Sequence, residues 1–555
     1  MLRWNAIPFL FLTLFQFYNA TRFHSAFLPT GSQPSPSTTV EFRIDLVQRN
    51  LDWLEDKINT VSNMDSPEYA NYLTNEDIRH MVGRSAKEIH LIIVWLQSQC
   101  TEICNMETNV LVHSDYIRVK TCVERAEFLL NTKIIEYEMA HTGKKILHSL
   151  HNEDVQFHLT SAPKEVASII EAISILGHPE PLPMRLGKNS DGSSTISFQG
   201  RIMSPKDIRS AYGLANVQRI DATDGNSSCA CAEFNNSFYF DDDIKTFQDL
   251  NLMPSNPVAK VIGKNDPNSK NATFSEASAD FEYITTVVCQ NTWAWFNAAG
   301  TFSDAIQEVF QNPDSPRINS VSYVQYEMYY SNQQLMRTNS ELIKAGASGF
   351  TWLFGSGDWG VNNPSAPKCS NYEPFFPATS PYALGIGGSY SDTVNISLEK
   401  AWTDSGSGFS NYFDIPDYQK TAIAKYLTTR NLPDSSKYNS SGRGIPDMAA
   451  FGSQFYIIED HHTRKVVGTS LATPITAAVF TYINALRASK GKPPIGFINP
   501  VLYKASTIGY DITEGHNIQE DCNGKTENAF YAAKGWDCIT GVGAPRLKAL
   551  LDLFL

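Results

Sequence analysis

The sequence predicts an α/β protein in two parts, with a doubly wound parallel sheet preceded by a smaller α/β unit. From about residue 200 onward, short apolar runs alternate with amphipathic stretches, as in a doubly wound sheet. Residues 40–175 show an alternation of their own, and a polar, proline-rich stretch separates the two parts. With 555 residues and 42% hydrophobic content, the chain is globular and exceeds one typical domain.

The N-terminal part mixes short strands with helices. Apolar residues at helical spacing predict a helix over 47–61, and Ser85–Glu88 forms a capping box before the apolar run 89–96. Pro163 suits the first turn of a helix, which is expected to continue over 166–173. The predicted strands are 42–46, 110–112 and 133–135. These elements predict a compact α/β unit.

The connecting stretch runs from Gly177 to Thr195. It holds three prolines and then a cluster of glycine, serine, asparagine and aspartate. Such a segment is exposed and open to cleavage, as an activation segment would be. Composition does not separate that reading from an ordinary interdomain linker.

The C-terminal part supplies the strands and helices of the larger sheet. Its predicted strands are 259–263, 318–323, 349–355 and 382–388, and its clearest helices are 276–288, 332–347 and 474–488.

The N-terminus favours a secretory signal over a buried helix. Arg3 precedes an apolar run over 6–15 that is too short to span a membrane, and cleavage is expected after Ala20 or Ala26. Five sequons support glycosylation in the secretory route: Asn226, Asn235, Asn271, Asn395 and Asn439. The nine cysteines are an odd number, so at least one stays unpaired. No membrane span is expected, and the net charge of -13 argues against a nucleic-acid partner.

Ser470 is the candidate nucleophile. It lies in Gly468–Pro474, where an apolar run leads into Gly-Thr-Ser and Pro474 is expected to open the helix that follows. A serine at a helix N-terminus has backbone N–H groups and the positive end of the helix dipole beside it, which favours an oxyanion there. The alternative is a serine that only caps the helix.

Glu276 and Asp280 are the candidate partners of that serine. They are four residues apart in the predicted helix 276–288, so both lie on one face. Adjacent carboxyls tend to share a proton, and a carboxylate is a competent base in acid, where imidazole is mostly protonated. The alternative is a solvated helix face. His461 and His462 lie in a charged stretch that is expected to be a surface loop.

Asp358 is the third candidate. It lies in the glycine-rich turn 355–360, directly after a predicted strand, where doubly wound folds place ligands. If protonated, its carboxyl could donate a hydrogen bond to an oxyanion. The alternative is an Asx turn that closes the loop.

Together these segments resemble the sedolisin family, the serine-carboxyl peptidases, through nearly the whole chain. Further similar segments are 63–73, 167–183, 204–214, 337–345, 409–413 and 443–447. The resemblance implies a subtilisin-like catalytic domain behind a ferredoxin-like prodomain that acts as inhibitor and chaperone. It implies Glu276 as general base, Asp280 as its partner, Ser470 as nucleophile and Asp358 as the oxyanion-hole acid.

The resemblance also implies one structural calcium ion. The matching ligand positions are Asp511, Ile512, Ala533, Gly535 and Asp537. Two carboxylates with backbone carbonyls suit calcium, and a carbonyl ligand survives alanine in place of the family's glycine at 533. The resemblance further suggests the disulfides Cys369–Cys522 and Cys104–Cys122.

Three departures from the family pattern bear on specificity. Trp359 and Val467 each replace a serine, and Val324–Tyr326 replaces a small, acidic stretch. The four candidate catalytic residues are intact.

The resemblance leads to the following expectation. A signal peptide (1–20), a prodomain (21–185) and an activation linker (186–200) precede a peptidase domain (201–555) in the lysosome or outside the cell. The enzyme would act in acid on peptides or unfolded proteins and release tripeptides from free N-termini. The alternatives are an acid endopeptidase and a catalytically silent secreted binding protein.

Overall fold

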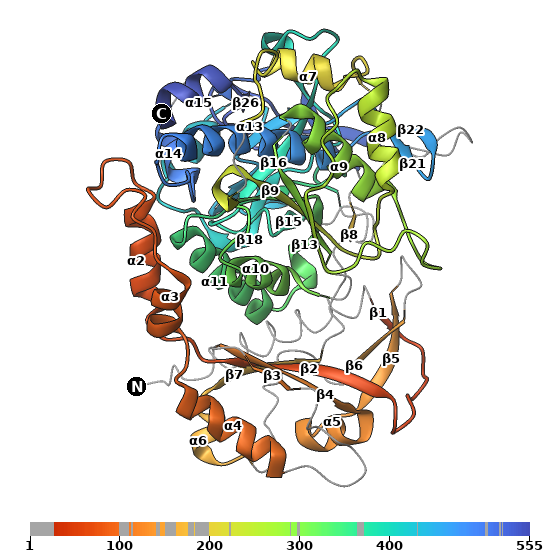
Figure 1. The fold of residues 1–555 in the computed structure, drawn as a ribbon, viewed down its shortest axis with the longest axis vertical. Helices are drawn as coiled ribbons and strands as arrows, with labels where there is room; N and C mark the ends of the chain where they lie inside the picture. Colours follow the sequence, from red (N-terminus) through yellow and green to blue (C-terminus); the bar gives the residue numbers. More distant parts are fainter. Residues whose placement is uncertain are drawn as a thin grey trace, which may run out of the picture. The chain divides into compact units, whose positions relative to one another are not determined.

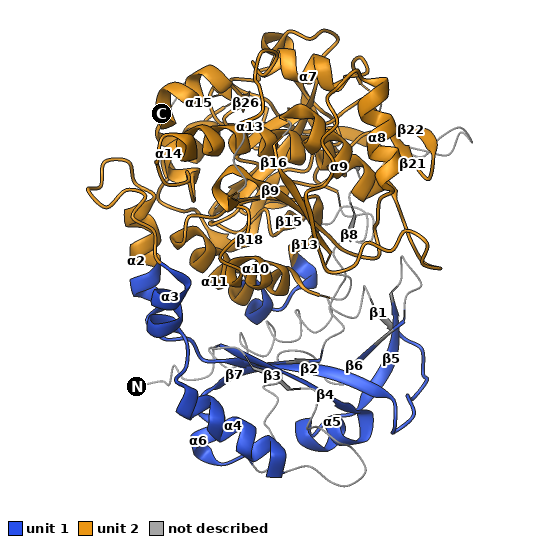
Figure 2. Ribbon diagram, viewed as in Figure 1, with its two compact units in different colours: residues 1–54, 74–179, 328–335 blue, residues 55–73, 180–327, 336–555 orange. Residues whose placement is uncertain are grey.

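The computed structural model describes most of the chain, in two compact units that Figure 2 colours separately. The described residues are 27–98, 110–112, 115–139, 145–149, 162–175, 182–183, 199–220, 224–288, 290–296, 300–362, 371–429, 431–505, 509–520, 523 and 525–555. Unit 1 comprises residues 1–54, 74–179 and 328–335, and unit 2 comprises 55–73, 180–327 and 336–555. The expected signal peptide and most of the expected activation linker lie outside the described residues, so the predicted domain boundaries stay predictions.

Unit 1 contains a four-stranded antiparallel sheet in the order β3-β4-β2-β7. With helices after β2 and β4, this order is that of a ferredoxin-like unit, as expected. Phe42 and Ile44 of β2 pack with Ile92 and Trp95 of α4 in its core. The elements are β1 (Phe27–Pro29), β2 (Thr39–Leu46), α3 (Asn75–Val82), α4 (Ala86–Ser98), β3 (Val110–Val112), β4 (Tyr116–Cys122), α5 (Val123–Leu130), β5 (Ile134–Met139), β6 (Lys145–Ser149), α6 (Lys164–Ala167) and β7 (Ile170–Ile175).

One local prediction in this unit is confirmed and another is wrong. The capping box forms, because Ser85 N donates to Glu88 and Glu88 N donates to the Ser85 hydroxyl. The helix expected over 166–173 ends at Ala167, and β7 begins at Ile170. The isoleucines of this segment are β-branched and favour a strand, and β7 pairs with β2 at one edge of the four-stranded sheet.

Unit 2 is built on a mainly parallel sheet (Figure 1). Within the described residues its order is β10-β11-β9-β12-β14-β16-β17, with β20 also paired to β16. All neighbours are parallel except β17. The strands are β9 (Cys229–Glu233), β10 (Lys260–Ile262), β11 (Thr292–Phe296), β12 (Ile318–Val321), β14 (Thr351–Gly355), β16 (Leu384–Tyr390), β17 (Lys400–Ala401) and β20 (Met448–Phe451).

The strand order reverses between β9 and β12. From β9 the chain first builds one side of the sheet through β10 and β11, and then returns to build the other side from β12. In doubly wound sheets, such a switch point opens a crevice at the carboxyl ends of the strands, where ligands bind. Glu233 ends β9, Ser322 follows β12 and Asp358 follows β14, so all three lie at this edge.

Smaller elements surround this sheet. The helices are α2 (Leu51–Val61), α7 (Pro205–Ala211), α8 (Asp241–Leu250), α9 (Ser275–Val287), α10 (Phe302–Gln311), α11 (Asn332–Ala347), α12 (Lys420–Tyr426), α13 (Thr469–Ser489), α14 (Asn499–Lys504) and α15 (Leu547–Phe554). The remaining strands are β8 (Leu182–Pro183), β13 (Tyr323–Tyr326), β15 (Phe375–Phe376), β18 (Gly408–Asp414), β19 (Gly442–Ile445), β21 (Phe455–Glu459), β22 (His462–Val466), β23 (Gly509–Tyr510), β24 (His516–Glu520), β25 (Thr526–Tyr531) and β26 (Ala544–Pro545).

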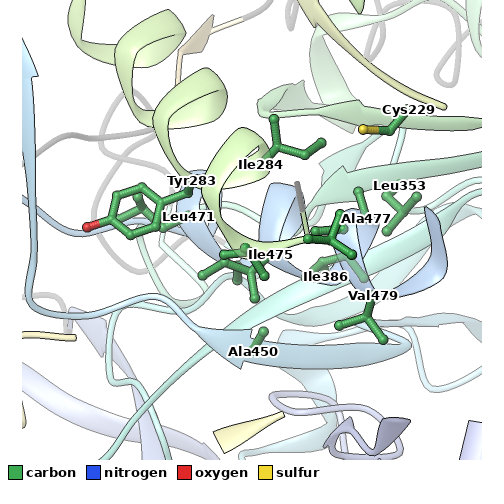
Figure 3. Packing of buried hydrophobic residues seen from close by; sticks show 14 of the residues in the cluster. Cys229, Tyr283, Ile284, Leu353, Ile386, Ala450, Leu471, Ile475, Ala477 and Val479 are labelled. Carbon is green, nitrogen blue, oxygen red and sulfur yellow. The ribbon is translucent and has the colours of Figure 1, made fainter. Parts of the chain in front are cut away.

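Helices α9 and α13 pack against each other and against the sheet. Figure 3 shows Leu471, Ile475 and Val479 of α13 among apolar side chains of the strands and of α9. Such burial contributes roughly 1.5–3 kcal/mol per large apolar side chain. The two helices that carry Glu276, Asp280 and Ser470 are therefore fixed by a common core.

The structure corrects the expected start of α13. The helix begins at Thr469, so Ser470 lies in its first turn and Pro474 lies inside it. Because Pro474 lies beyond the first four residues of the helix, its missing N–H removes one hydrogen bond of the helix, the one to the Ser470 carbonyl.

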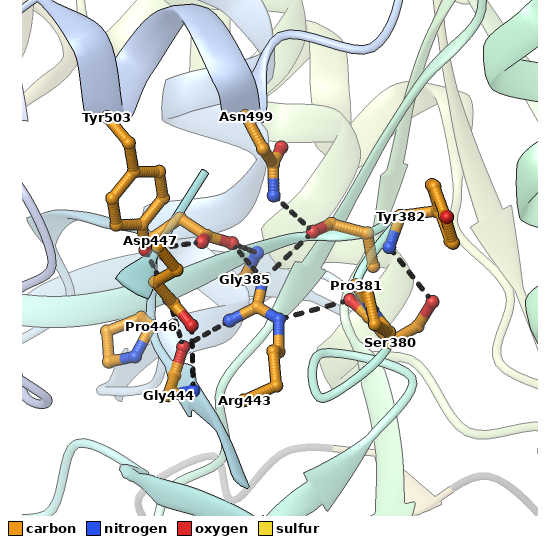
Figure 4. Close-up of polar contacts among 12 residues, drawn as sticks. Ser380, Pro381, Tyr382, Gly385, Arg443, Gly444, Pro446, Asp447, Asn499 and Tyr503 are labelled. Atoms are coloured by element: carbon orange, nitrogen blue, oxygen red, sulfur yellow. Dashed lines mark hydrogen bonds and ion pairs between the residues drawn. The ribbon is translucent and has the colours of Figure 1, made fainter. Parts of the chain in front are cut away.

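A buried ion pair joins β19 to the residue just before β20, and a further hydrogen bond links it to β16 (Figure 4). Arg443 donates to Asp447 Oδ2 at 2.6 Å, and neither side chain is exposed to solvent. Asp447 also accepts from Gly385 N at 2.7 Å and from the Tyr503 hydroxyl at 2.7 Å. Arg443 donates further to the carbonyls of Ser380 and Ala383. Every charge in this cluster has its hydrogen-bond partners.

Candidate active site

Helix α9 carries the two candidate carboxylates into the interior. Glu276 is 3% exposed and Asp280 is not exposed at all. The α9 residues after Ser275 are all buried, so the solvated helix face is excluded. Burial of two carboxyls one turn apart demands that they share protons.

Ser470 is brought to the same place by α13. It is fully buried, and its hydroxyl lies close enough to the Glu276 carboxyl to favour that carboxyl's charged form. Neither group makes a hydrogen bond of normal geometry in this state. Loose contacts of this kind are common between a nucleophile and its base before substrate binds.

Asp358 contacts the residues just before Ser470. Its Oδ1 accepts hydrogen bonds from Thr469 N at 2.8 Å and from the Thr469 hydroxyl at 3.0 Å. A side chain at Gly468 would meet Asp358 Oδ2 at 2.9 Å, so glycine is needed there. The Gly-Thr-Ser sequence thus positions Asp358 directly beside the N-terminus of α13.

Glu233 is a fourth buried carboxyl that the sequence analysis missed. It ends β9, is 1% exposed and accepts from the Tyr323 hydroxyl at 2.9 Å. Burial, and then the negative charge of Asp280, raises the pKa of Glu233. The available signal was a single acid at the carboxyl end of an apolar strand.

The carboxyls of this cluster hold protons to unusually high pH. Burial raises the pKa of Asp280 to about 8 even though a hydrogen bond from Ser322 opposes the shift. Burial, and then the negative charge of Asp280, raises the pKa of Glu276. Among the described residues, the charged groups acting on Glu276 are Asp280, Glu233 and Asp358, all of them carboxylates. The cluster titrates as a unit and resists carrying more than a little charge.

An aromatic group borders the site. The Phe375 ring lies against Gly357, where a side chain would meet it at 2.4 Å. Phe375 also packs on Tyr326, with ring centroids 4.3 Å apart, and stacks on Trp359 at 5.7 Å. Trp359 is partly exposed, whereas Tyr326 and Phe375 are buried. Two of the departures noted in the sequence thus meet beside Asp358.

The expected calcium-binding positions come together around one turn near the C-terminus. Asp511 Oδ2 accepts from Gly535 N at 2.9 Å, and Asp537 Oδ2 accepts from Ala533 N at 3.0 Å. The Ile512 carbonyl accepts from Thr540. Two carboxylates therefore flank the turn 533–537, and this hard-oxygen donor set fits calcium.

His461 and His462 are not part of the catalytic cluster. They lie at the turn of the β21–β22 hairpin, and the His461 ring contacts Asp243 at 2.8 Å. Of the cysteines described, Cys229, Cys231 and Cys538 are buried free thiols, and Cys122 is disulfide-bonded. The expected cysteine pairs include Cys104, Cys369 and Cys522, which lie outside the described residues.

Known proteins resemble this chain over most of its length. Residues 29–177 match the family "Pro-kumamolisin, activation domain". The chain is 31% identical to mouse tripeptidyl-peptidase 1 over 548 residues, covering 95% of this chain and 94% of the relative. It is 30% identical to the human tripeptidyl-peptidase 1 over 550 residues, with the same coverage. A solved structure of Pseudomonas sedolisin covers 64% of this chain and 98% of its own, with 20% identity and a TM-score of 0.49, too distant to bear on function.

The chain therefore belongs to the sedolisin family of serine-carboxyl peptidases. It is a serine-type peptidase made with an activation prodomain. Its matched relatives above are tripeptidyl-peptidases 1. No helix in the described part of the chain is long and apolar enough to cross a membrane.

Proposed function

We propose that the protein is an acid-acting tripeptidyl-peptidase in which Ser470, Glu276, Asp280 and Asp358 carry the chemistry. The observation that supports this most is the meeting of α9, α13 and the turn after β14 at one buried cluster of carboxyls. Release of tripeptides rests on the names of the relatives.

In the proposed mechanism Glu276 takes the proton of Ser470 as its Oγ attacks the carbonyl carbon of the peptide bond. The electron pair moves onto the carbonyl oxygen, which the Asp358 carboxyl and the Ser470 N–H hold. Collapse expels the amine, which receives the proton from Glu276 and leaves an acyl-enzyme. Water then attacks the ester by the same route. Asp280 orients Glu276 and shares its proton.

Acidic solution suits this cluster because buried carboxyls are more stable when most of them are protonated. One negative charge shared among the carboxyls suffices for a base, and the Ser470 and Ser322 hydroxyls favour the charged forms of Glu276 and Asp280 against burial. Further ionisation adds negative charge where the oxyanion develops, and activity should fall.

The prodomain is proposed to inhibit at the substrate edge. Residues Leu182 and Pro183, just before the expected activation linker, pair antiparallel with Val324 and Tyr323 of β13. An added strand at such an edge is a common way to hold an extended peptide. A substrate backbone and this segment would therefore compete for one position.

A second prodomain segment, residues 55–73, belongs to the same compact unit as the catalytic residues. The Tyr72 ring lies against Gly349 and Gly496, and its hydroxyl donates to the Pro494 carbonyl at 3.1 Å. Glu55 accepts from Tyr382, and Asp65 pairs with Lys504. These contacts hold the segment against the catalytic unit, so activation must break them.

The test is product mass from an unblocked peptide and its N-acetylated twin, after activation at about pH 4. Tripeptides from the free peptide alone, absent with Ser470→Ala, are expected. Internal cuts in both peptides would instead mean an endopeptidase. Absence of cleavage by activated, folded enzyme would favour the binding protein.

Calcium is proposed to hold the turn 533–537 through Asp511, Asp537 and backbone carbonyls. Calcium bound only to the folded state stabilises by mass action. Chelation should therefore lower the thermal midpoint of the wild type but leave Asp511→Asn nearly unchanged. An unchanged wild type would contradict the proposal.

The secretory pathway, ending in the lysosome or outside the cell, is the proposed location. The sequons Asn271 and Asn395 are exposed, and Cys122 is disulfide-bonded. Disulfides persist in oxidising compartments.

A further inference from the structure

Helix α13 lacks one of its backbone hydrogen bonds at the candidate nucleophile, Ser470. In an α-helix, the carbonyl of one residue accepts from the N–H four residues later. The residue four after Ser470 is Pro474, which has no N–H. The Ser470 carbonyl, which is buried with its residue, therefore lacks that helical donor. A buried carbonyl without a donor is costly, so another group is needed there.

Ser322 supplies a hydroxyl at this position. It is fully buried in the break between β12 and β13. Its Oγ lies 3.2 Å from the Ser470 carbonyl oxygen and 2.6 Å from Asp280 Oδ1. One side chain from the sheet thus touches both the nucleophile's residue and the partner of the general base. The sequence predicted one continuous strand over 318–323, so the break at Ser322 was not expected.

The two contacts of Ser322 depend on where protons lie. A hydroxyl has one proton to donate, and it can accept at its lone pairs. When Asp280 is ionised, Ser322 donates to it across the shorter distance. When Asp280 carries a proton on Oδ1, it can donate to Ser322, whose own proton is then free for the Ser470 carbonyl. The two states differ by one proton, whose O–H bond to Asp280 forms or breaks, and otherwise only in their hydrogen bonds.

The groups that face Asp280 are carboxyls, a thiol and a phenol. Glu276 lies on the same helix, Glu233 and Cys231 come from β9, and Tyr323 follows Ser322 in β13. None of these groups is a cation. Ser322 is therefore a neutral donor that favours the Asp280 carboxylate without adding a fixed positive charge.

We propose that Ser322 is a positioning residue that holds Asp280 and fills the hydrogen-bond position at the Ser470 carbonyl left open by Pro474. Its catalytic consequence rests on the proposed function. Its hydroxyl links the protonation of the base's partner to the backbone of the nucleophile.

The test compares Ser322→Ala with Ser320→Ala in the activated full-length protein. Ser320 is the matched control, because it is also buried on β12 but its hydroxyl bonds to neither carboxylate. For Ser322→Ala we expect kcat to fall about 10- to 100-fold, the range for losing a hydrogen bond to a charged group. KM should stay unchanged, and the acid limb of kcat/KM should move to higher pH, because Asp280 loses a donor that favours its charged form. Ser320→Ala should match the wild type.

A second variant isolates the contact with the carbonyl. Pro474→Ala returns an N–H to the helix, so the Ser470 carbonyl no longer needs Ser322. Ser322→Ala should then lower kcat less in the Pro474→Ala background than in the wild type, while the shift of the acid limb stays. Equal losses in both backgrounds would overturn the role at the carbonyl.

Two further outcomes keep this inference separate from the proposed function. Ser322→Ala with wild-type kcat and an unmoved acid limb would overturn it. If the wild type itself cleaves nothing, the proposed function fails, but the thermal midpoint still tests the contact with Asp280. That midpoint should fall more steeply with rising pH in Ser322→Ala than in Ser320→Ala, because Asp280 then keeps its proton to higher pH. Parallel curves would overturn the inference.

Discussion

Two buried acidic regions of unit 2 solve the same electrostatic problem in opposite ways. Asp447 meets a guanidinium and two neutral donors, so its charge is balanced where it lies. Glu276, Asp280 and Glu233 meet one another, and the charged groups acting on Glu276 are all carboxylates. The Arg443–Asp447 region holds the backbone of neighbouring segments together through hydrogen bonds to Ser380, Ala383 and Gly385. The second keeps its charge low by holding protons, and exchangeable protons are what general acid–base catalysis needs.

The largest expected difference between the regions is in activity. Ser470→Ala should lower kcat by about 10⁴-fold or more, because the nucleophile and its base act as a unit. The thermal midpoint should change little, since only one hydroxyl is removed. Kinetics and thermal unfolding on the same sample check both. Glu276→Gln, which keeps the shape and volume of the side chain, should lower kcat to a similar extent. A near-normal kcat for Glu276→Gln would show that Glu276 is not the base.

The ion pair should show the reverse pattern. Arg443→Ala leaves Asp447 as a buried charge without its partner and should lower the free energy of unfolding by about 3–5 kcal/mol. Activity per folded molecule should persist. Lys420→Ala, which breaks an exposed pair with Asp417, is the control and should have almost no effect. If denaturant unfolding showed the same loss of unfolding free energy in both variants, burial would not determine how much an ion pair contributes to stability.

The carboxyl cluster should make stability fall as pH rises. A carboxyl whose pKa is raised on folding binds more protons in the folded state, so folding is favoured below the unfolded pKa and weakens as pH passes through the folded one. The pKa of Asp280 is raised from 3.8 to about 8, and that of Glu399, another buried carboxyl, from 4.5 to about 8. Stability should therefore decline between about pH 4 and about pH 8. Thermal midpoints of Ser470→Ala, which cannot digest itself, would measure this.

Glu399→Gln sharpens that experiment. Glu399 accepts a hydrogen bond from the Ser389 hydroxyl, away from the catalytic residues. Its removal should flatten part of the decline without changing the pH profile of catalysis. If the thermal midpoint of Glu399→Gln falls with pH as steeply as that of the parent protein, Glu399 does not contribute to the decline.

The smallest expected effect concerns the aromatic group beside Asp358. Trp359→Ser removes the partly exposed ring that stacks on Phe375 but leaves Asp358 in place. We expect kcat/KM for peptides with a bulky apolar residue near the cut to fall by about tenfold or less, the scale of one apolar contact. Stability should be close to that of the wild type. A uniform loss across all peptides would mean that Trp359 supports the oxyanion site instead of a subsite.

Most of the correct predictions from the sequence came from short motifs. The spacing of Glu276 and Asp280 fixed their common helix face, and Gly-Thr-Ser marked a helix N-terminus. The alternation of apolar runs gave the sheet of unit 2. The ferredoxin-like order of unit 1 followed from the resemblance alone, since strand pairing cannot be read from periodicity.

What the sequence could not predict are contacts made by single residues in unremarkable segments. Glu233 ends an apolar strand, and Ser322 occupies a break within what looked like one strand. Their partners come from α9 and α13, far away in the sequence, so only the fold brings them together. Pro474 was expected to open its helix, but tertiary packing extends α13 back to Thr469 and thereby exposes the gap at the Ser470 carbonyl.

The most direct test of the central claim is the pH dependence of kcat/KM for activated enzyme from about pH 3 to about pH 8, with saturation checked throughout. A base made of carboxyls that share protons predicts a maximum in acid and a steep loss toward neutral pH, measured over times in which the enzyme stays folded. A profile that rises through about pH 6.5 to a neutral plateau, as an imidazole base would give, would contradict the account.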